Sequence, residues 1–430
     1  MTAGTDYPRV VITGIGIVSP IGIGKHAFWQ SLTGGKSGID FLQTIPASDL
    51  PTKLAAEIRD FVPENYIANK KFIKVMTRDI QLGVAAASLA MSDSKLKETG
   101  TDPDRLGVVF GAGRIPTTPG ELAAVTRACL GADANFDPQL WGTESLNHIH
   151  PLWLLRQLPN MPACHVSIEH DARGPNNTIT NRDSSAILAL AEGRRVIERG
   201  AADYMIVGAS TSHLNPVDLA KMGLYERLNQ RWTDPQKACR PFDRDRDGII
   251  VGEGAAAFIL ESYEHAHRRG APIYGEILGV GAGCDAATSD SSDLGRGLSV
   301  AVQAALRQAG IEPSELGHIN AHGKSTLPDD CIESRAYHRS LGDYAESIPV
   351  TAMKSYFGHF EAGSGAVELA GTLLSLQGGI LPPTLNYETP DPMCRLNVTR
   401  EGPHKLKTRT AISVNRSSIG QSAAVVVRAM

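Results

Sequence analysis

Two histidines and one aspartate occupy short loops that join predicted strands to predicted helices. His322 lies in the stretch Asn-Ala-His-Gly-Lys after a short apolar run, and His359 precedes a glycine-rich stretch that begins a helical pattern. Asp183 follows an extended segment and directly precedes the helical stretch SSAILALAEG. Imidazoles and carboxylates are common proton-transfer groups in enzymes, so a site that gathers these residues predicts acid–base chemistry.

Asp183 also has an interpretation that needs no chemistry. Aspartate is a favoured helix N-cap, worth about 1 kcal/mol relative to alanine, and the helix dipole favours its anion. The sequence leaves the cap and the chemical role open at this position. For His322 the alternative is a loop histidine bonded to backbone, and for His359 it is a structural histidine near a helix N-terminus.

Strands and helices alternate along the chain and must bring these residues together. Strands are predicted at Arg9–Val18, Gly107–Gly111, Asp203–Ala209, Ala255–Glu261, Tyr274–Gly281, His318–Ala321, Thr410–Val414 and Ala423–Val427, and helices at Gln81–Met91, Ser184–Arg199 and Gly297–Ala309. This alternation of strands and helices predicts an α/β fold with helices covering the sheets. The second half repeats the first, which favours duplicated halves at residues 1–265 and 266–430.

The composition and the net charge indicate which broad class of protein the chain belongs to. The 430 residues are 42% hydrophobic and 20% charged, as in ordinary globular proteins, and the net charge of −4 argues against general nucleic-acid binding. The N-terminus lacks a secretory signal pattern and no apolar run spans a bilayer, so a cytoplasmic protein without a membrane span is expected. The six cysteines are scattered without metal-ligand spacing, so free thiols and no metal site are expected.

Four segments, in order over nearly the whole chain, resemble signatures of one enzyme family. They are RVVITGIGIVSPIG near the N-terminus, RPFDRDRDGIIVGEGAAAFILE at 240–261, NAHGKSTLPDD at 320–330 and KSYFGHFEAGSGAVE at 354–368. The chain thus resembles the β-ketoacyl-acyl carrier protein synthases, condensing enzymes of the thiolase fold. The resemblance implies a layered α-β-α-β-α body. Its N-terminal half would hold the nucleophile, dimer strand and carrier-protein dock, and its C-terminal half both histidine loops and the gating loop.

The family's chemistry implies roles for several of these residues. A cysteine at a helix N-terminus takes an acyl chain from a carrier protein as a thioester, and two histidines promote decarboxylation of malonyl-carrier protein. The resemblance assigns catalytic positions to Asp183, His322, His359 and Lys354, and supporting positions to Asp330 and Glu333. Asp183 stands where the cysteine should be. A carboxylate attacking a thioester would give a mixed anhydride that water destroys, so no stable acyl-enzyme is expected.

Further residues are implied for the substrate and pantetheine channel, namely Lys324, Thr326, Ile419 and Arg114. Lys324 replaces a small hydroxyl residue and is a candidate partner for Asp183 or for the malonyl carboxylate. Arg182 is a second candidate partner of Asp183. Ile419 would supply an oxyanion-hole backbone N–H in an altered gating loop, and Arg114 would shorten the acyl pocket.

The resemblance also implies partners. Lys71 and Lys74 match basic positions that dock an acidic acyl carrier protein, and a solvated charged face is the alternative. Ala163–Pro175 resembles the strand and loop that pair subunits, so a homodimer or a heterodimer with a ketosynthase paralogue is expected. No cofactor is expected on the chain itself, because the carrier protein supplies the phosphopantetheine arm. Two functions remain open: a decarboxylase or other acid–base catalyst on acyl thioesters, and a non-catalytic chain-length partner of an active synthase.

Overall fold

A mixed sheet of 14 strands runs through the molecule, in a computed structural model that describes residues 7–46, 49–115, 117–231, 234–285 and 294–430. Its main path is, in order, β13 (Asn397–Val398), β11 (Pro349–Thr351), β10 (His318–Asn320), β15 (Thr410–Arg416), β16 (Gln421–Arg428), β9 (Gly275–Cys284), β1 (Val10–Ser19), β8 (Val251–Ser262), β7 (Tyr204–Ser212), β5 (Leu106–Ala112) and β6 (Asn176–Ile179). Off this path lie β2 (Gly22–Ile23), β3 (Ile39–Phe41) and β4 (Leu54–Ala56). A separate pair consists of β12 (Ile380–Leu381) and β14 (His404–Lys405).

The sheet consists of two groups of strands that meet at β1 and β9. Every strand before residue 263 lies on the β1 side of the path, and every later strand of the path lies on the β9 side. The two groups are joined through the short pairing of Val11 with Glu276 and of Ile12 with Gly275. The division of the chain into halves at residues 265 and 266 stays a prediction.

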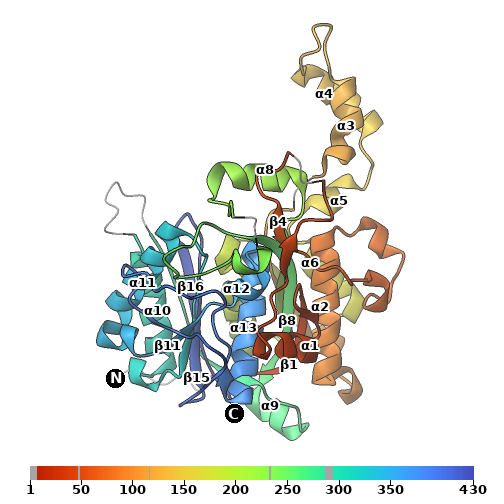
Figure 1. Ribbon diagram of the computed structural model, residues 1–430. Coiled ribbons are helices and arrows are strands. Elements are labelled where there is room, and N and C mark those ends of the chain that lie inside the picture. Colours follow the sequence, from red (N-terminus) through yellow and green to blue (C-terminus); the bar gives the residue numbers. More distant parts are fainter. Residues whose placement is uncertain (1–6, 47–48, 116, 232–233, 286–293) are drawn as a thin grey trace.

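Helices cover and separate these two groups of strands. In the centre, α7 (Ser185–Glu198) packs on β5 and β7, while α13 (Glu361–Gly378) packs on β7, β8 and β15. Outside them, α2 (Arg78–Ser94) packs on β1, β7 and β8, and α10 (Arg296–Ala309) packs on β9 and β16. Figure 1 shows α13 between the two groups of strands, so the predicted order of helix, sheet, helix, sheet and helix is confirmed.

The remaining helices surround this body. They are α1 (Lys25–Thr33), α3 (Pro119–Ala128), α4 (Pro138–His148), α5 (Trp153–Gln157), α6 (Met161–His170), α8 (Pro216–Tyr225), α9 (Tyr263–Arg268), α11 (Leu327–Leu341) and α12 (Lys354–Phe357). Helices α3 and α4 form an arm that projects from the body (Figure 1). None of the helices in the described ranges has the length and apolarity to cross a membrane.

The predicted dimer strand within Ala163–Pro175 is wrong. Residues Met161–His170 form the helix α6, which buries Ala163, Val166 and His170 at helical spacings of three and four residues. Pro162 in the first turn favours the helix because it has no N–H to leave unpaired there. Among the described strands β6 pairs with β5 alone, so the edge of the sheet nearest to this segment lies at Asn176–Ile179 instead.

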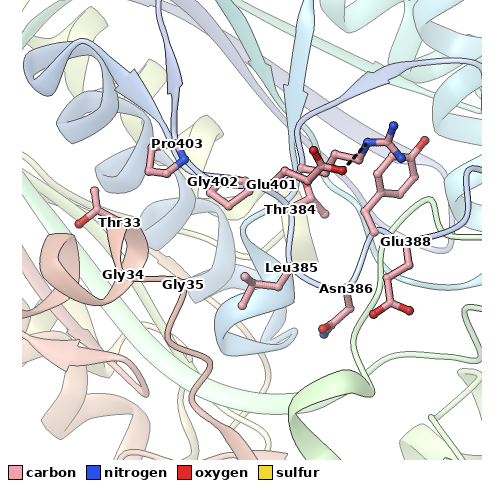
Figure 2. A pocket seen from close by; sticks show the side chains of 13 residues that line it. Thr33, Gly34, Gly35, Thr384, Leu385, Asn386, Glu388, Glu401, Gly402 and Pro403 are labelled. Atoms are coloured by element: carbon pink, nitrogen blue, oxygen red, sulfur yellow. Dashed lines mark ion pairs between the residues drawn. The ribbon is translucent and has the colours of Figure 1, made fainter.

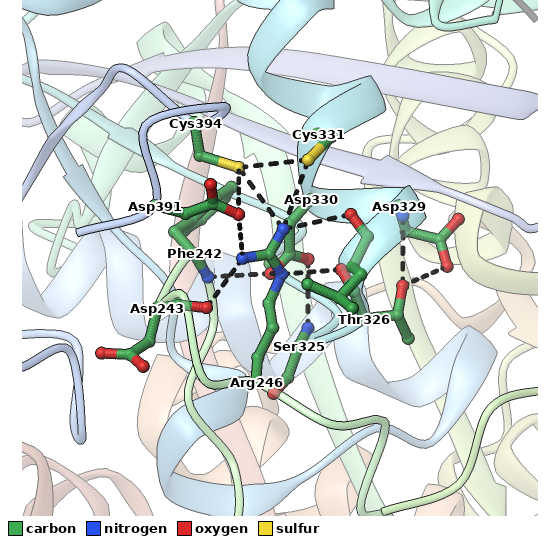
Figure 3. A network of polar contacts seen from close by, with 12 residues as sticks. Phe242, Asp243, Arg246, Ser325, Thr326, Asp329, Asp330, Cys331, Asp391 and Cys394 are labelled. Atoms are coloured by element: carbon green, nitrogen blue, oxygen red, sulfur yellow. Dashed lines mark hydrogen bonds and ion pairs between the residues drawn. The ribbon is translucent and has the colours of Figure 1, made fainter. Parts of the chain in front are cut away.

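A buried arginine ties the segment before β8 to the loop that follows β10. The guanidinium of Arg246 donates to the carbonyl of Thr326 at 2.9 Å and to the carboxylate of Asp391 at 2.7 Å, and lies 3.2 Å from Asp330 (Figure 3). Asp330 also accepts hydrogen bonds from the backbone N–H groups of Phe242 and Ser325. This network joins residues 80 to 145 positions apart and holds the loop that carries His322.

Removing this guanidinium should destabilise the fold strongly. In Arg246→Met, the buried carboxylates of Asp330 and Asp391 lose their counter-charge, and breaking such a buried pair costs about 3–5 kcal/mol. Urea denaturation at neutral pH measures the free energy of unfolding. As a control, Arg227→Met removes an arginine whose side chain is 57% exposed, and its cost should stay within about 1 kcal/mol. Equal losses in the two variants would contradict the role given to Arg246.

Candidate active site

Asp183, His322 and His359 lie together in the interior of the protein. Oδ1 of Asp183 lies 3.5 Å from Nε2 of His359 and 3.8 Å from Nε2 of His322, and all three side chains are buried. The two imidazole rings are nearly perpendicular, with centroids 5.9 Å apart. Among the described residues, Oδ1 of Asp183 and Nε2 of His322 have no hydrogen-bond partner. The three polar atoms therefore face one another, with hydrogen-bonding capacity that the described residues leave unused.

The start of α7 turns Asp183 inward and does not use it as a cap. Residues Arg182–Ser184 form a short 3₁₀ turn before the helix, with Arg182 in the left-handed region at φ 49°. The N-cap residue is Ser184, and Asp183 makes no hydrogen bond to the first turn. The cap interpretation of Asp183 is therefore wrong. Arg182 is exposed and, within the described contacts, forms no ion pair with Asp183.

Lys354 determines which nitrogen of His322 carries the proton. The Lys354 ammonium donates to Nδ1 of His322 at 3.1 Å and to its carbonyl oxygen at 2.7 Å, and also pairs with Glu368. A lysine ammonium has no lone pair to offer, so Nδ1 must accept and Nε2 must carry the hydrogen. Glu333 accepts hydrogen bonds from the backbone N–H groups of His322 and Gly323 and fixes the loop.

Backbone pairing fixes His359 against β8. Its N–H donates to the carbonyl of Ile250 at 2.7 Å, and its carbonyl accepts from the N–H of Gly252 at 3.1 Å. The preceding Gly358 has φ 73°, and a Cβ there would lie 2.8 Å from the carbonyl oxygen of Ile250. This tight approach requires glycine and places the His359 ring next to Asp183.

Desolvation dominates the protonation of the site. Burial raises the pKa of Asp183 to about 7, against the lowering effect of Lys324 and Lys354. Burial also lowers the pKa of His322 and of His359 well below the usual histidine value, and the nearby lysines lower both further. Near neutral pH both imidazoles are therefore neutral, and their short contacts with Asp183 are not ion pairs.

Lys324 does not pair with Asp183, contrary to the first of its two predicted partnerships. Its Nζ donates to Glu226 at 2.9 Å and lies 3.9 Å from Asp329. These acids lie at the end of α8 and the start of α11, on either side of the lysine. Lys324 therefore acts on Asp183 only through space. The neighbouring Thr326 is buried and caps α11 by accepting a hydrogen bond from the N–H of Asp329.

The other predicted channel residues lie nearer the surface. Ile419 is in the turn between β15 and β16 with 57% of its surface exposed. Arg114 is largely exposed and donates to Asp218 at 3.1 Å. Lys71 and Lys74 are exposed at the 3₁₀ turn Phe72–Val75, a position open to a partner. Their predicted roles stay predictions.

A third histidine, which no sequence motif indicated, lies beside the site. His213 follows β7, and its Nδ1 lies 2.5 Å from the carboxylate of Asp218 on α8. Its ring centroid lies 6.5 Å from that of His359. A histidine five residues before an aspartate, at a predicted strand end, is too weak a pattern to be distinguished from a surface pair. Only the tertiary structure, in which His213 meets Asp218 and lies beside the ring of His359, makes it part of the site.

Two pockets differ in how close they lie to these residues. A pocket of about 320 Å³ lies between the ends of β5 and β7, α8 and the start of α13, and its lining includes Arg114, His213, Asp218, Glu226 and Glu361. A second pocket of about 600 Å³ lies between the end of α1 and the loops at 383–388 and 400–403 (Figure 2). Only the first pocket shares residues with the surroundings of Asp183 and His359.

Neither cluster of potential metal ligands fits a metal ion. Asp183, His322 and His359 offer atoms within 4.8 Å of one another, but Lys354 keeps the proton on Nε2 of His322, which a metal would need bare. Cys331, Asp391 and Cys394 form the other cluster. There the Arg246 guanidinium already contacts both sulfur atoms and the carboxylate (Figure 3).

Comparisons with known proteins agree on one family. Residues 8–266 match the model of the beta-ketoacyl synthase N-terminal domain, and residues 274–388 match that of the C-terminal domain. A 3-oxoacyl-[acyl-carrier-protein] synthase 2 of Coxiella burnetii is 35% identical over 406 residues, which cover 94% of each chain.

Two solved structures extend this similarity to the fold. One is a type II polyketide synthase acyl-carrier protein in complex with its ketosynthase bound to the hexaketide; it is 29% identical with a TM-score of 0.82 and covers 99% of this chain and 100% of that one. The other is the ishigamide ketosynthase/chain length factor, 28% identical with a TM-score of 0.83 and the same coverage. The thiolase-like fold expected from the sequence is thereby confirmed.

The raised pKa of Asp183 should appear in the pH dependence of stability. The native state holds this proton more tightly than the unfolded state, so its stabilising effect is lost as pH rises from about 4 through about 7. Asp183→Asn has no proton to lose at this position. The difference in unfolding free energy between Asp183→Asn and the wild type should therefore change in favour of the variant by at most about 4 kcal/mol from low pH to about pH 8.5. Urea denaturation across this range measures the difference. Asp60→Asn, the same change on the surface, corrects for net charge; a pH-independent difference for Asp183→Asn would contradict the prediction.

Proposed function

The chain belongs to the β-ketoacyl synthase family, and from this premise we propose that it acts on malonyl thioesters without forming an acyl-enzyme. In this proposal Asp183 takes the place of the nucleophilic cysteine. The thioester arrives on the phosphopantetheine arm of an acyl carrier protein that docks at Lys71 and Lys74, in a cytosolic pathway of fatty-acid or polyketide type. The similar ketosynthase solved with its carrier protein supports this choice of partner.

The observation that carries the proposal is the contact of one buried carboxyl oxygen with two imidazoles. Oδ1 of Asp183 lies 3.5 and 3.8 Å from the two Nε2 atoms and has no hydrogen-bond partner among the described residues. A carboxyl group with a pKa of about 7 is half protonated near neutral pH, so it can donate a proton there. As a neutral acid it also avoids the repulsion that its anion would exert on the malonyl carboxylate.

The proposed reaction is decarboxylation followed by protonation. The bond between the malonyl methylene carbon and its carboxylate breaks, carbon dioxide leaves, and the electron pair moves onto the thioester oxygen as an enolate. Nε2–H of His322 and a ring N–H of His359 donate to that oxygen as its charge grows. The methylene carbon then takes the proton of Asp183, which gives an acetyl thioester. Solvent returns a proton to Asp183.

The proposal predicts a pH-dependent release of carbon dioxide from malonyl-carrier protein. Because Asp183 must be protonated, the rate should fall as pH rises through about 7. Asp183→Asn removes the proton and His359→Ala removes an enolate donor, so each should lower kcat by about 10²- to 10⁴-fold. His26→Ala, on the exposed His26, serves as the matched control and should keep the wild-type rate.

Two results would overturn this function. One is carbon dioxide release at the wild-type rate in both Asp183→Asn and His359→Ala. The other is a lasting acyl adduct on Asp183, detected by mass spectrometry after incubation with acyl-carrier protein, because the proposal allows no stable acyl-enzyme.

A second candidate is a non-catalytic chain-length partner of a cysteine-bearing ketosynthase. The free edge of β6 and the exposed apolar side chains of the projecting arm, such as Leu146 with 87% exposed, favour a dimer with either a second copy or a paralogue. The similar ketosynthase/chain length factor structure supports the paralogue.

Co-expression with such a paralogue separates the two candidates. If this chain itself decarboxylates the malonyl thioester, His359→Ala should lower carbon dioxide release whether the chain is alone or paired with the paralogue. A stoichiometric heterodimer whose carbon dioxide release is unchanged by His359→Ala would favour the non-catalytic partner and contradict the first function.

A further inference from the structure

A second buried histidine–carboxylate pair lines the pocket beside the three site residues. Nδ1 of His213 lies 2.5 Å from one carboxylate oxygen of Asp218, and the other oxygen accepts from Arg114 at 3.1 Å. His213 is 4% exposed, and its ring centroid lies 6.5 Å from that of His359. Asp218 is thus satisfied on both oxygens, and the other nitrogen of His213 is left for a different partner.

That other nitrogen has no partner among the described residues. Nε2 of His213 is buried and makes no hydrogen bond. Burial lowers the pKa of His213, but the hydrogen bond and charge of Asp218, with Glu361 and Asp79 adding, raise it to about 9. The ring is therefore a cation at neutral pH, and Nε2 carries a hydrogen that it can donate. A buried charged donor without an acceptor is costly, and a bound ligand that supplies the acceptor would remove this cost.

Several charged side chains contribute to the pocket lining. Beside the His213–Asp218 pair these are Arg114, Arg182, Lys221, Glu226 and Glu361. Arg182 and Lys221 form no ion pair with any residue that the structure describes. An alkyl chain would remove water from these charges without replacing its hydrogen bonds, which is unfavourable.

From this geometry we propose that the pocket selects an acyl thioester that carries an acceptor oxygen, as a keto group or a carboxylate, and that Nε2–H of His213 donates to that oxygen. The proposal rests on the proposed function in one respect, since it assumes that the thioester lies between His322 and His359. Because the rings of His213 and His359 are 6.5 Å apart, the recognised oxygen lies within a few atoms of the thioester carbonyl. His213 is then a specificity-determining residue.

Binding of three pantetheine amides of equal chain length tests this selection. Butyryl-, acetoacetyl- and succinyl-pantetheine amides differ in the oxygen that the acyl chain carries. In each of them an amide bond replaces the thioester, so the compound is not cleaved during the measurement. Titration calorimetry on the full chain should show that acetoacetyl, succinyl or both bind about tenfold or more tightly than butyryl, as expected for a buried hydrogen bond to a charged donor. Preference for acetoacetyl identifies a keto group, and preference for succinyl identifies a carboxylate. Equal affinities for all three would overturn the proposal.

Variants at the pair connect the preference to His213. His213→Phe should abolish it, His213→Gln should keep part of it because the amide still donates, and Asp218→Asn should lower it because the ring loses the charge that holds its proton. His165→Phe makes the same change at another buried histidine, in α6, and should leave the preference intact. If His213→Phe fails to fold, which thermal melting would show, the acyl preference of Asp218→Asn and of His213→Gln still tests the role of His213. An unchanged preference in all folded variants at His213 and Asp218 would overturn the proposal.

This test is independent of turnover. If the wild-type protein shows the acyl preference but releases no carbon dioxide, only the proposed decarboxylation is contradicted. If it releases carbon dioxide but shows no acyl preference, only the proposal for His213 is contradicted.

Discussion

The cost of burying one carboxyl group without a hydrogen-bond donor governs the chemistry of this site. Asp183 lies at the start of α7 in the centre of the molecule, and burial raises its pKa more than Lys324 and Lys354 lower it. Water would solvate an exposed aspartate and keep it ionised at neutral pH. Here the same residue type becomes an acid that exchanges its proton near pH 7. The neutral imidazoles of His322 and His359 arise from the same desolvation.

Such a site needs rigid support, because every polar atom in it is far from water. The support comes from a buried chain of contacts in which Glu368 on α13 binds both Lys354 and the side chain of Asn415 on β15. Lys354 in turn holds the ring of His322. The Arg246–Asp330 pair secures the same loop from its other side. These buried polar networks orient the site residues, and the Arg246–Asp330 pair also joins the two parts of the chain.

The pocket that holds the His213–Asp218 pair lies beside this site. On the proposal that Asp183 takes the place of a nucleophilic cysteine, the site has no means to hold an acyl chain covalently, so selectivity would come from noncovalent contacts. The His213–Asp218 pair offers a fixed, charged donor for that purpose within 6.5 Å of His359, measured between the rings. The acid at Asp183 and the donor at His213 are therefore compatible parts of one site, although each can be tested alone.

The sequence by itself determined the alternation of strands and helices, because periodicity specifies elements that depend mainly on nearby residues. The thiolase-like fold and the positions of His322 and His359 followed from the resemblance of four of its segments to the β-ketoacyl synthase family. The sequence could not decide between a helix and a strand for Met161–His170, since that short apolar segment is compatible with both until it packs on α2. Tertiary structure alone decided that Asp183 turns inward, that Lys324 pairs with Glu226, and that His213 joins Asp218 in the pocket. These are contacts between side chains on different elements, and their protonation depends on burial, which a one-dimensional pattern does not contain.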